Sequence, residues 1–118
     1  MRSLTILGST GSIGVSTLDV VRRRLDQFKV HALVAGQNVD LLAAQIVEFR
    51  PAVAVLETES LLEHLKSRLT SLGHGRVYWP QFGFGAQARV EAATSPETDF
   101  VLSAIVGRST MVRLFRTR

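Results

Sequence analysis

Three glycines at every third position, Gly8, Gly11 and Gly14, directly follow a short run of apolar residues at 4–7. The run predicts a buried strand, and the apolar stripe of residues 12–25 predicts a helix. In a strand-to-helix turn of this kind, the first glycine permits the sharp exit and the second lets the backbone approach a pyrophosphate. The third lets the helix pack closely on the sheet. We therefore predict a dinucleotide-binding βαβ unit rather than a glycine-rich turn without a ligand.

The remainder of the chain alternates between apolar runs and amphipathic stretches. Strands are predicted at 29–35, 52–56, 76–79 and 99–106, helices at 38–50, 60–72 and 86–93, and a loop at 81–85. Asn38 is a good N-cap for the second helix, and Ser60 with Glu63 reads as a capping box for the third. This alternation is typical of right-handed crossovers in an α/β fold.

We expect a single Rossmann-like domain with a mainly parallel sheet and helices on both faces. Because the pattern ends after the strand at 99–106, we expect the sheet to be incomplete at its C-terminal side, with an unpaired edge beside that strand.

Composition narrows the functional classes. The 118 residues are 46% apolar and 20% charged, which is a globular composition, and no apolar run is long enough to cross a bilayer. There is no cysteine, which excludes disulfides and thiolate chemistry. No signal or transit segment is recognisable before the first strand, so we expect a cytoplasmic protein without a membrane partner.

The formal net charge of +4 comes from one end of the chain. Four arginines and no acidic residue lie within residues 108–118, whereas residues 1–107 are formally neutral. The body has no basic stripe with interleaved aromatic residues, so a nucleic-acid partner is not expected.

The residues after the second predicted strand bear on the choice of dinucleotide. Enzymes that use NAD usually carry an acidic residue there, which binds the ribose 2′-OH. This chain has Gly36, Gln37 and Asn38 instead, with no carboxylate to repel a 2′-phosphate and two side chains that can donate hydrogen bonds. The pattern favours NADP(H), and the cap role of Asn38 is compatible with that function.

With these segments placed, the sequence resembles the N-terminal domain of the 1-deoxy-D-xylulose 5-phosphate reductoisomerase family. The resemblance rests on residues 4–14, 16–21, 32–36 with Asn38, and 104–107. The family makes 2-C-methyl-D-erythritol 4-phosphate, an isoprenoid precursor, by a metal-assisted rearrangement and hydride transfer from NADPH, and it forms homodimers.

The resemblance implies roles for particular residues. Thr10, Gly11, Ser12 and Ile13 would bind the cofactor phosphates, and Gly36, Gln37 and Asn38 would surround the adenosine 2′-phosphate. Many family members have Lys or Arg where this chain has Gln37. Residues 104–107 would lie near the nicotinamide side of the crevice.

The likeness stops at Gly107. Residues 108–118 do not follow the family pattern, and the family's ligands for Mg or Mn and its substrate-phosphate residues lie beyond this point. We expect residues 1–107 to be an NADPH-binding domain and 108–118 a basic tail, encoded out of frame or at an artificial junction. No catalytic or metal-binding residues are assigned, so an enzyme activity of the chain alone is left open.

Two other functions are also compatible with this sequence. A regulatory domain that senses a dinucleotide would need no catalytic half, and an arginine tail that binds nucleic acid would show a steep salt dependence. The histidines His31, His64 and His74 fit no ligand spacing and are expected to be structural or at the surface.

Overall fold

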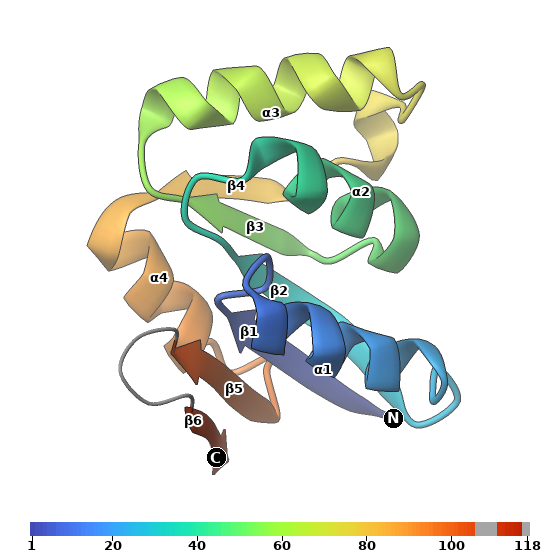
Figure 1. Ribbon diagram of the computed structural model, residues 1–118, viewed down its shortest axis with the longest axis vertical. Helices are drawn as coiled ribbons and strands as arrows, with labels where there is room; N and C mark the ends of the chain where they lie inside the picture. Colours follow the sequence, from blue (N-terminus) through green and yellow to red (C-terminus); the bar gives the residue numbers. More distant parts are fainter. Residues whose placement is uncertain (106–110, 117–118) are drawn as a thin grey trace.

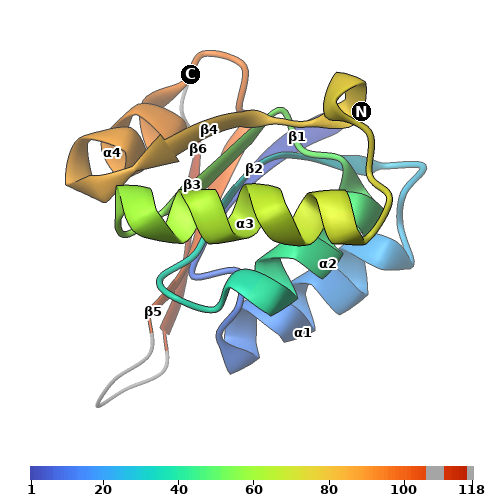
Figure 2. The same ribbon diagram turned by 90° about the horizontal axis from the view of Figure 1, so that it is seen from above.

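A single sheet lies between two layers of helices (Figures 1 and 2). The computed structural model describes residues 1–105 and 111–116. Within those ranges the strand order is β4-β3-β2-β1-β5-β6. The elements, in chain order, are β1 (Arg2–Leu7), α1 (Ser12–Arg22), β2 (Phe28–Val34), α2 (Val39–Phe49), β3 (Val53–Leu56), α3 (Glu59–Ser71), the 3-10 helix η1 (Arg76–Tyr78), β4 (Gln81–Phe84), α4 (Gly85–Thr94), β5 (Phe100–Ile105) and β6 (Met111–Arg116). The predicted Rossmann-like α/β fold is confirmed.

The direction of chain progression reverses at β1. Strands β1 to β4 are laid down one beside another in parallel, and β5 then returns to pair with the free side of β1. A right-handed crossover must change faces when its direction reverses. Figure 2 accordingly shows α1, α2 and α3 on one face and α4 on the other. The reversal makes the carboxyl ends of β1 and β5 a topological switch point, where ligands of such folds bind.

Side chains along β2 point alternately to the two faces of the sheet and contribute to the hydrophobic core on each face. Leu33 faces the three-helix layer, where it is fully buried together with Ile6, Leu42 and Leu65. Ala32 and Val34 point to the opposite face and pack with a smaller cluster that includes Ala92 of α4. Since both faces of the parallel strands are covered, these strands read in the sequence as continuous apolar runs.

The fourth strand lies later in the chain than predicted. Residues 76–79 were expected to form a strand and 81–85 a loop, but the first segment contains η1 and the second contains β4. Val77 is 85% exposed, so the β-branched and aromatic residues there have no sheet surface to cover. Phe82 instead pairs with Ala54 of β3 and meets the Trp79 ring edge-on at 5.6 Å. Pairing with β3 therefore outweighs local strand propensity.

Two helix ends also differ from the predictions. Helix α1 ends at Arg22 rather than near Leu25, whose side chain is 54% exposed and adds nothing to the core. Helix α3 is capped by Thr58, whose hydroxyl accepts from Leu61 N–H at 3.4 Å, and not by Ser60. The predicted cap Asn38 is confirmed, because its Oδ1 accepts from Leu41 N–H at 3.1 Å.

The edge beside β5 is paired, and the expectation of an open edge there is wrong. Strand β6 runs antiparallel to β5, with Leu102 opposite Leu114 and Ile105 opposite Met111. Backbone pairing of a short returning segment satisfies the free N–H and C=O groups that an edge strand would otherwise expose.

Candidate functional site

The turn after β1 is built on a backbone conformation that requires glycine. Gly8 has φ of +84°, a left-handed value that side chains disfavour. The N–H groups of Gly8 and Ser9 both donate to Val34 O, at 2.8 and 3.0 Å. The turn is residues 8–11 and is called the phosphate turn below, after its predicted ligand. These bonds anchor it to the carboxyl end of β2, which explains why the phosphate turn and the loop after β2 lie at the same edge of the sheet.

Helix α1 packs against this turn through Gly14. A Cβ atom added at Gly14 would lie 2.1 Å from Gly8 O and 2.7 Å from Cα of Ser9. Only a hydrogen atom fits in that space. The role predicted for the third glycine, close packing of the helix on the strand end, is thus seen directly.

The N-terminus of α1 follows directly on the turn after β1 (Figure 1, the blue loop between β1 and α1). Gly11 is the N-cap, and no side chain caps the helix. The first bond inside the helix runs from Val15 N–H to Gly11 O at 2.9 Å. The N–H groups of Ser12, Ile13 and Gly14 therefore have no acceptor in the helix, and the helix dipole adds positive potential there. This end of α1 can hold a phosphate or pyrophosphate.

Exposure separates the predicted phosphate contacts from Ser9. Thr10, Gly11, Ser12 and Ile13 are all partly or fully exposed and can be reached by a ligand. The neighbouring Ser9 is 0% exposed. Its hydroxyl cannot donate to a ligand from this position, because the turn folds the side chain inward.

The second predicted cluster lies at the carboxyl end of β2. Gly36 is half-buried, whereas Gln37 and Asn38 are exposed. Asn38 uses its Oδ1 to cap α2, which leaves its Nδ2 group to donate to a ligand. The parallel pairing of Leu7 with Val34 places this loop beside the phosphate turn. The two groups of predicted residues thus share one edge of the sheet.

Sequence reasoning missed a carboxylate at this edge. Glu57 directly follows β3, its N–H donates to Gly36 O at 3.2 Å, and its Oε2 lies 3.4 Å from where a Gly36 Cβ would stand. The available signal was its place directly after the neighbouring parallel strand, whose carboxyl end meets the same edge. The loop after β2 therefore combines amide donors with one negative charge.

A hollow of about 540 Å³ adjoins the loop, between the start of α2 and the side of α3. It is lined by Gln37 and Asn38 on one side and by His64 and Arg68 on the other. The Nε atom of Arg68 lies 3.5 Å from Asp40 Oδ1, an exposed pair. Arg68 of α3 thus places a positive charge on the wall of the hollow that Gln37 and Asn38 also line.

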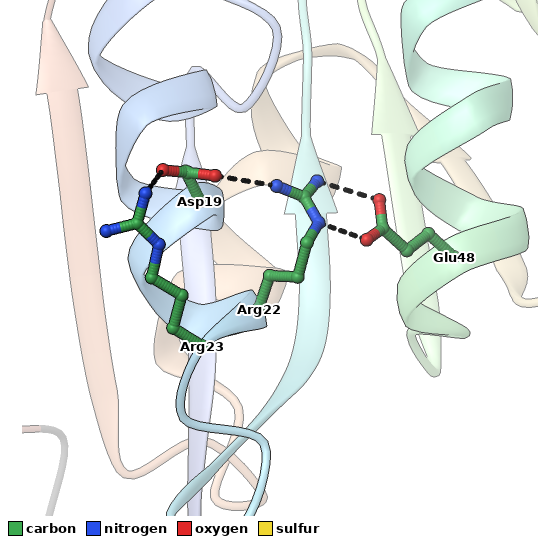
Figure 3. Close-up of polar contacts among 4 residues, drawn as sticks. All are labelled: Asp19, Arg22, Arg23 and Glu48. Atoms are coloured by element: carbon green, nitrogen blue, oxygen red, sulfur yellow. Dashed lines mark hydrogen bonds and ion pairs between the residues drawn. The ribbon is translucent and has the colours of Figure 1, made fainter.

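Helices α1 and α2 are joined at their far ends by a group of ion pairs (Figure 3). The Arg22 guanidinium donates to both carboxylate oxygens of Glu48, and it also donates to Asp19 at 3.0 Å. Asp19 accepts in addition from Arg23 at 2.9 Å. The hydrogen bond from Arg22 lowers the pKa of Glu48, and Glu48 raises the pKa of Arg22. These contacts fix how the two helices lie beside each other.

Helix α2 also reaches the phosphate turn directly. Gln45, a polar residue on the inner face of α2, donates from Nε2 to Ser9 O at 2.9 Å. Sequence reasoning missed this contact as well. The signal was a glutamine between Leu42 and Ile46, at the spacing of the buried stripe.

His31 and His74 form contacts within the fold. His74 lies between Tyr78 O, 3.3 Å from its Nε2, and the Trp79 indole N–H, which donates to His74 O at 3.0 Å. Burial lowers the pKa of His31, which lies 3.5 Å from the Ser95 hydroxyl. Across residues whose side chains are described, no three His, Asp or Glu side chains gather as a metal site would require.

No helix in the described part of the chain has the length and apolar character of a membrane span. The side chains of the arginine-rich segment 108–118 and of residues 104–107 lie outside the described residues. The predicted nicotinamide-side role of 104–107 remains a prediction.

Comparison with known proteins identifies close similarities across nearly all of the chain. The family model of 1-deoxy-D-xylulose 5-phosphate reductoisomerase matches residues 4–116. The match extends beyond Gly107, where the sequence analysis expected the likeness to stop. The reductoisomerase of Solibacter usitatus is 50% identical over 107 residues, which is 91% of this chain and 27% of that protein. The reductoisomerase of Chlorobaculum tepidum is 43% identical over 116 residues, 98% of this chain and 29% of that protein.

Solved structures agree with the sequence matches. The reductoisomerase from Zymomonas mobilis in complex with NADPH superimposes with a TM-score of 0.76 at 40% identity, covering 90% of this chain and 26% of that one. A reductoisomerase in complex with magnesium gives a TM-score of 0.79 at 33% identity, covering 92% of this chain and 26% of that one. The chain spans only about a quarter of the relatives it matches.

Proposed function

Because the chain belongs to the 1-deoxy-D-xylulose 5-phosphate reductoisomerase family, we propose that it forms the part of that enzyme that binds NADPH. The observation that carries the proposal is the uncapped N-terminus of α1 at the switch point between β1 and β5. Three N–H groups without helical acceptors, a helix dipole and a turn too tight for a side chain at Gly14 fit a pyrophosphate closely. NADPH supplies the hydride of the family reaction.

Each end of the cofactor would have its own group of residues. Thr10, Gly11, Ser12 and Ile13 would hold the pyrophosphate through backbone N–H groups and two hydroxyls. Gly36 would allow close approach of the adenosine ribose. Gln37 and Asn38 would donate to the 2′-phosphate, and Arg68 would add the positive charge that position 37 lacks.

We further propose that this chain does not complete the reaction alone. The rearrangement in the family is metal-assisted, and a divalent metal needs a set of oxygen or imidazole ligands. The described residues do not fit such an ion, because no suitable cluster of side chains exists among them. The chain spans 27% of its Solibacter relative, so metal and substrate binding are expected from the other parts of the enzyme.

Calorimetric titration of the 118-residue chain with NADPH and with NADH tests the proposal. We expect saturable binding of NADPH and weaker binding of NADH. Binding of neither cofactor would refute the proposed function. Preferential binding of NADH would refute the assignment of Gln37 and Asn38 to the 2′-phosphate.

Two substitutions sharpen the test at the adenosine end. Gln37→Lys adds a cation beside the 2′-phosphate, and Glu57→Gln removes a negative charge from the same loop. Each substitution should strengthen the binding of NADPH several-fold. Neither should strengthen the binding of NADH, which lacks the 2′-phosphate. Glu59→Gln is the matched control, since it removes a carboxylate from the first turn of α3 without touching Gly36.

A further inference from the structure

We propose that Gln45 is a positioning residue that sets the direction of the Ser9–Thr10 peptide and thereby turns the Thr10 N–H toward the cofactor phosphates. The proposal rests on the proposed function, but it concerns a residue of α2 that lies outside the turn itself. It assigns to the buried amide a specific task in phosphate binding.

The burial of Gln45 calls for an explanation beyond helix packing. Gln45 is 6% exposed and Ser9 is 0% exposed. Placing an amide in such surroundings is unfavourable unless it forms hydrogen bonds. The Nε2 group has one, to Ser9 O, whereas Gln45 Oε1 and Ser9 Oγ have no partner among the described residues. A leucine or methionine would fill the same position without that cost, so packing alone does not account for the glutamine.

The bond acts on the peptide that matters most for a ligand. Ser9 N–H is held by Val34 O at 3.0 Å, which fixes the peptide before Ser9. Gln45 fixes the peptide after it, through the Ser9 carbonyl at 2.9 Å. The structure has no cis peptide bonds in the described residues. In a planar trans peptide the C=O and the following N–H point in opposite directions. With the carbonyl aimed at Gln45 of α2, the Thr10 N–H points away from that amide, and Thr10 itself is partly exposed and can be reached by a ligand.

Without Gln45, this carbonyl has no hydrogen-bond donor among the described residues. Rotation of the peptide would aim the Ser9 oxygen outward, where it would repel a phosphate, and would bury the Thr10 N–H. Gln45 therefore favours the one orientation in which the turn attracts an anion. Since the same helix carries Asn38 at its N-terminus, α2 links the phosphate turn to the loop that would receive the 2′-phosphate.

The test compares Gln45→Met, which keeps the length but removes the donor, with Ile46→Val, which weakens the adjacent core position without changing a polar group. The Kd of NADP⁺ is measured for both variants and for the unchanged chain, after thermal unfolding confirms that each is folded. We expect Gln45→Met to weaken NADP⁺ binding about tenfold and Ile46→Val to leave it unchanged. Equal affinity of Gln45→Met and the unchanged chain would overturn the proposal.

Gln45→Glu adds a readout that a purely structural role would not change. Near pH 8 its carboxylate cannot donate to Ser9 O and repels it, whereas near pH 5 the protonated acid can donate. The ratio of its Kd to that of the unchanged chain, measured at the same pH, should fall as the pH is lowered. A ratio independent of pH would contradict the proposal, and so would an unimpaired affinity at pH 8.

Amide hydrogen exchange in the absence of cofactor separates this inference from the proposed function. We expect faster exchange of Ser9 N–H in Gln45→Met than in Ile46→Val, because the turn loses one of its two anchors. Equal exchange in the two variants would overturn the positioning role even if NADPH binds. If the unchanged chain binds no cofactor, the proposed function fails, and exchange still decides whether Gln45 orders the turn.

Discussion

Substitution of Gly14 by alanine tests the geometry of the phosphate turn most directly. The added Cβ would stand 2.1 Å from Gly8 O and 2.7 Å from two backbone atoms of Ser9. Those atoms cannot swing aside as the tip of a side chain can, because Gly8 and Ser9 are both hydrogen-bonded to Val34 O. Either α1 must move away from the sheet or the turn must rearrange.

The size of the effect follows from two opposing contributions. Alanine is a better helix former than glycine by about 1 kcal/mol in a helix interior, and by less in the first turn, where Gly14 lies. Overpacking costs about 1–3 kcal/mol, and contact with anchored backbone puts this site at the upper end. We expect the free energy of unfolding to fall by about 2 kcal/mol, which lowers Tm by roughly 8 °C in a domain of this size.

Urea unfolding followed by circular dichroism measures this change, and titration with NADPH measures its effect on binding. Gly36→Ala is the control for stability, because its Cβ would meet only Glu57 Oε2, at 3.4 Å. That variant should stay within about 0.5 kcal/mol of the unchanged chain. If Gly14→Ala is as stable as Gly36→Ala and binds NADPH normally, the close approach of α1 to the turn does not matter and the reasoning is refuted.

Other contacts lead to three further predictions. Breaking the exposed Arg22–Glu48 pair in a double-mutant cycle should have a small effect on stability that shrinks further at high salt. Because the folded pKa of Glu48 is lowered from 4.5 by the hydrogen bond from Arg22, the contribution of the pair is present above pH 4.5 and disappears as the pH falls through the folded pKa. A coupling that does not change with pH would contradict this prediction. Burial lowers the folded pKa of His31 from 6.5, so the unfolded chain binds more protons and the free energy of unfolding should fall as the pH drops below 6.5. His31→Gln should reduce this dependence of stability on pH, measured by urea unfolding at several pH values. An unchanged dependence would show that burial of the imidazole is not responsible. Thr58→Ala should destabilise the chain by about 1 kcal/mol, because α3 loses its cap. Ser60→Ala should lower the thermal stability less. A larger loss of stability in Ser60→Ala than in Thr58→Ala would restore Ser60 as the cap.

Local signals account for the parts that could be predicted. A glycine at positive φ, a helix start without a capping side chain, and an asparagine N-cap depend on a few consecutive residues. The glycine turn between β1 and α1 and the Asn38 cap were therefore predicted correctly. The fold class follows in the same way, because strands buried on both faces must be apolar throughout and the helices between them must be amphipathic.

Elements whose stability comes from distant partners were not predictable in this way. The segment 76–79 has the residues of a strand but no sheet to join, while Gln81–Phe84 becomes a strand by pairing with β3. Strand β6 exists through its pairing with β5. Glu57 approaches Gly36 only because β2 and β3 lie parallel and end at the same edge.

The sequence by itself determined the turn between β1 and α1, since its three glycines specify a backbone path that few other residues can form. Only the tertiary structure decided how that turn is held. The anchors are Val34 O on the neighbouring strand and the Gln45 amide on α2, a helix that begins thirty-one residues after Gly8. A hydrogen bond between residues 36 positions apart cannot be predicted from the local sequence pattern. The sequence shows only a polar residue on an otherwise apolar helix face, and the fold explains that residue because it places Ser9 beside it.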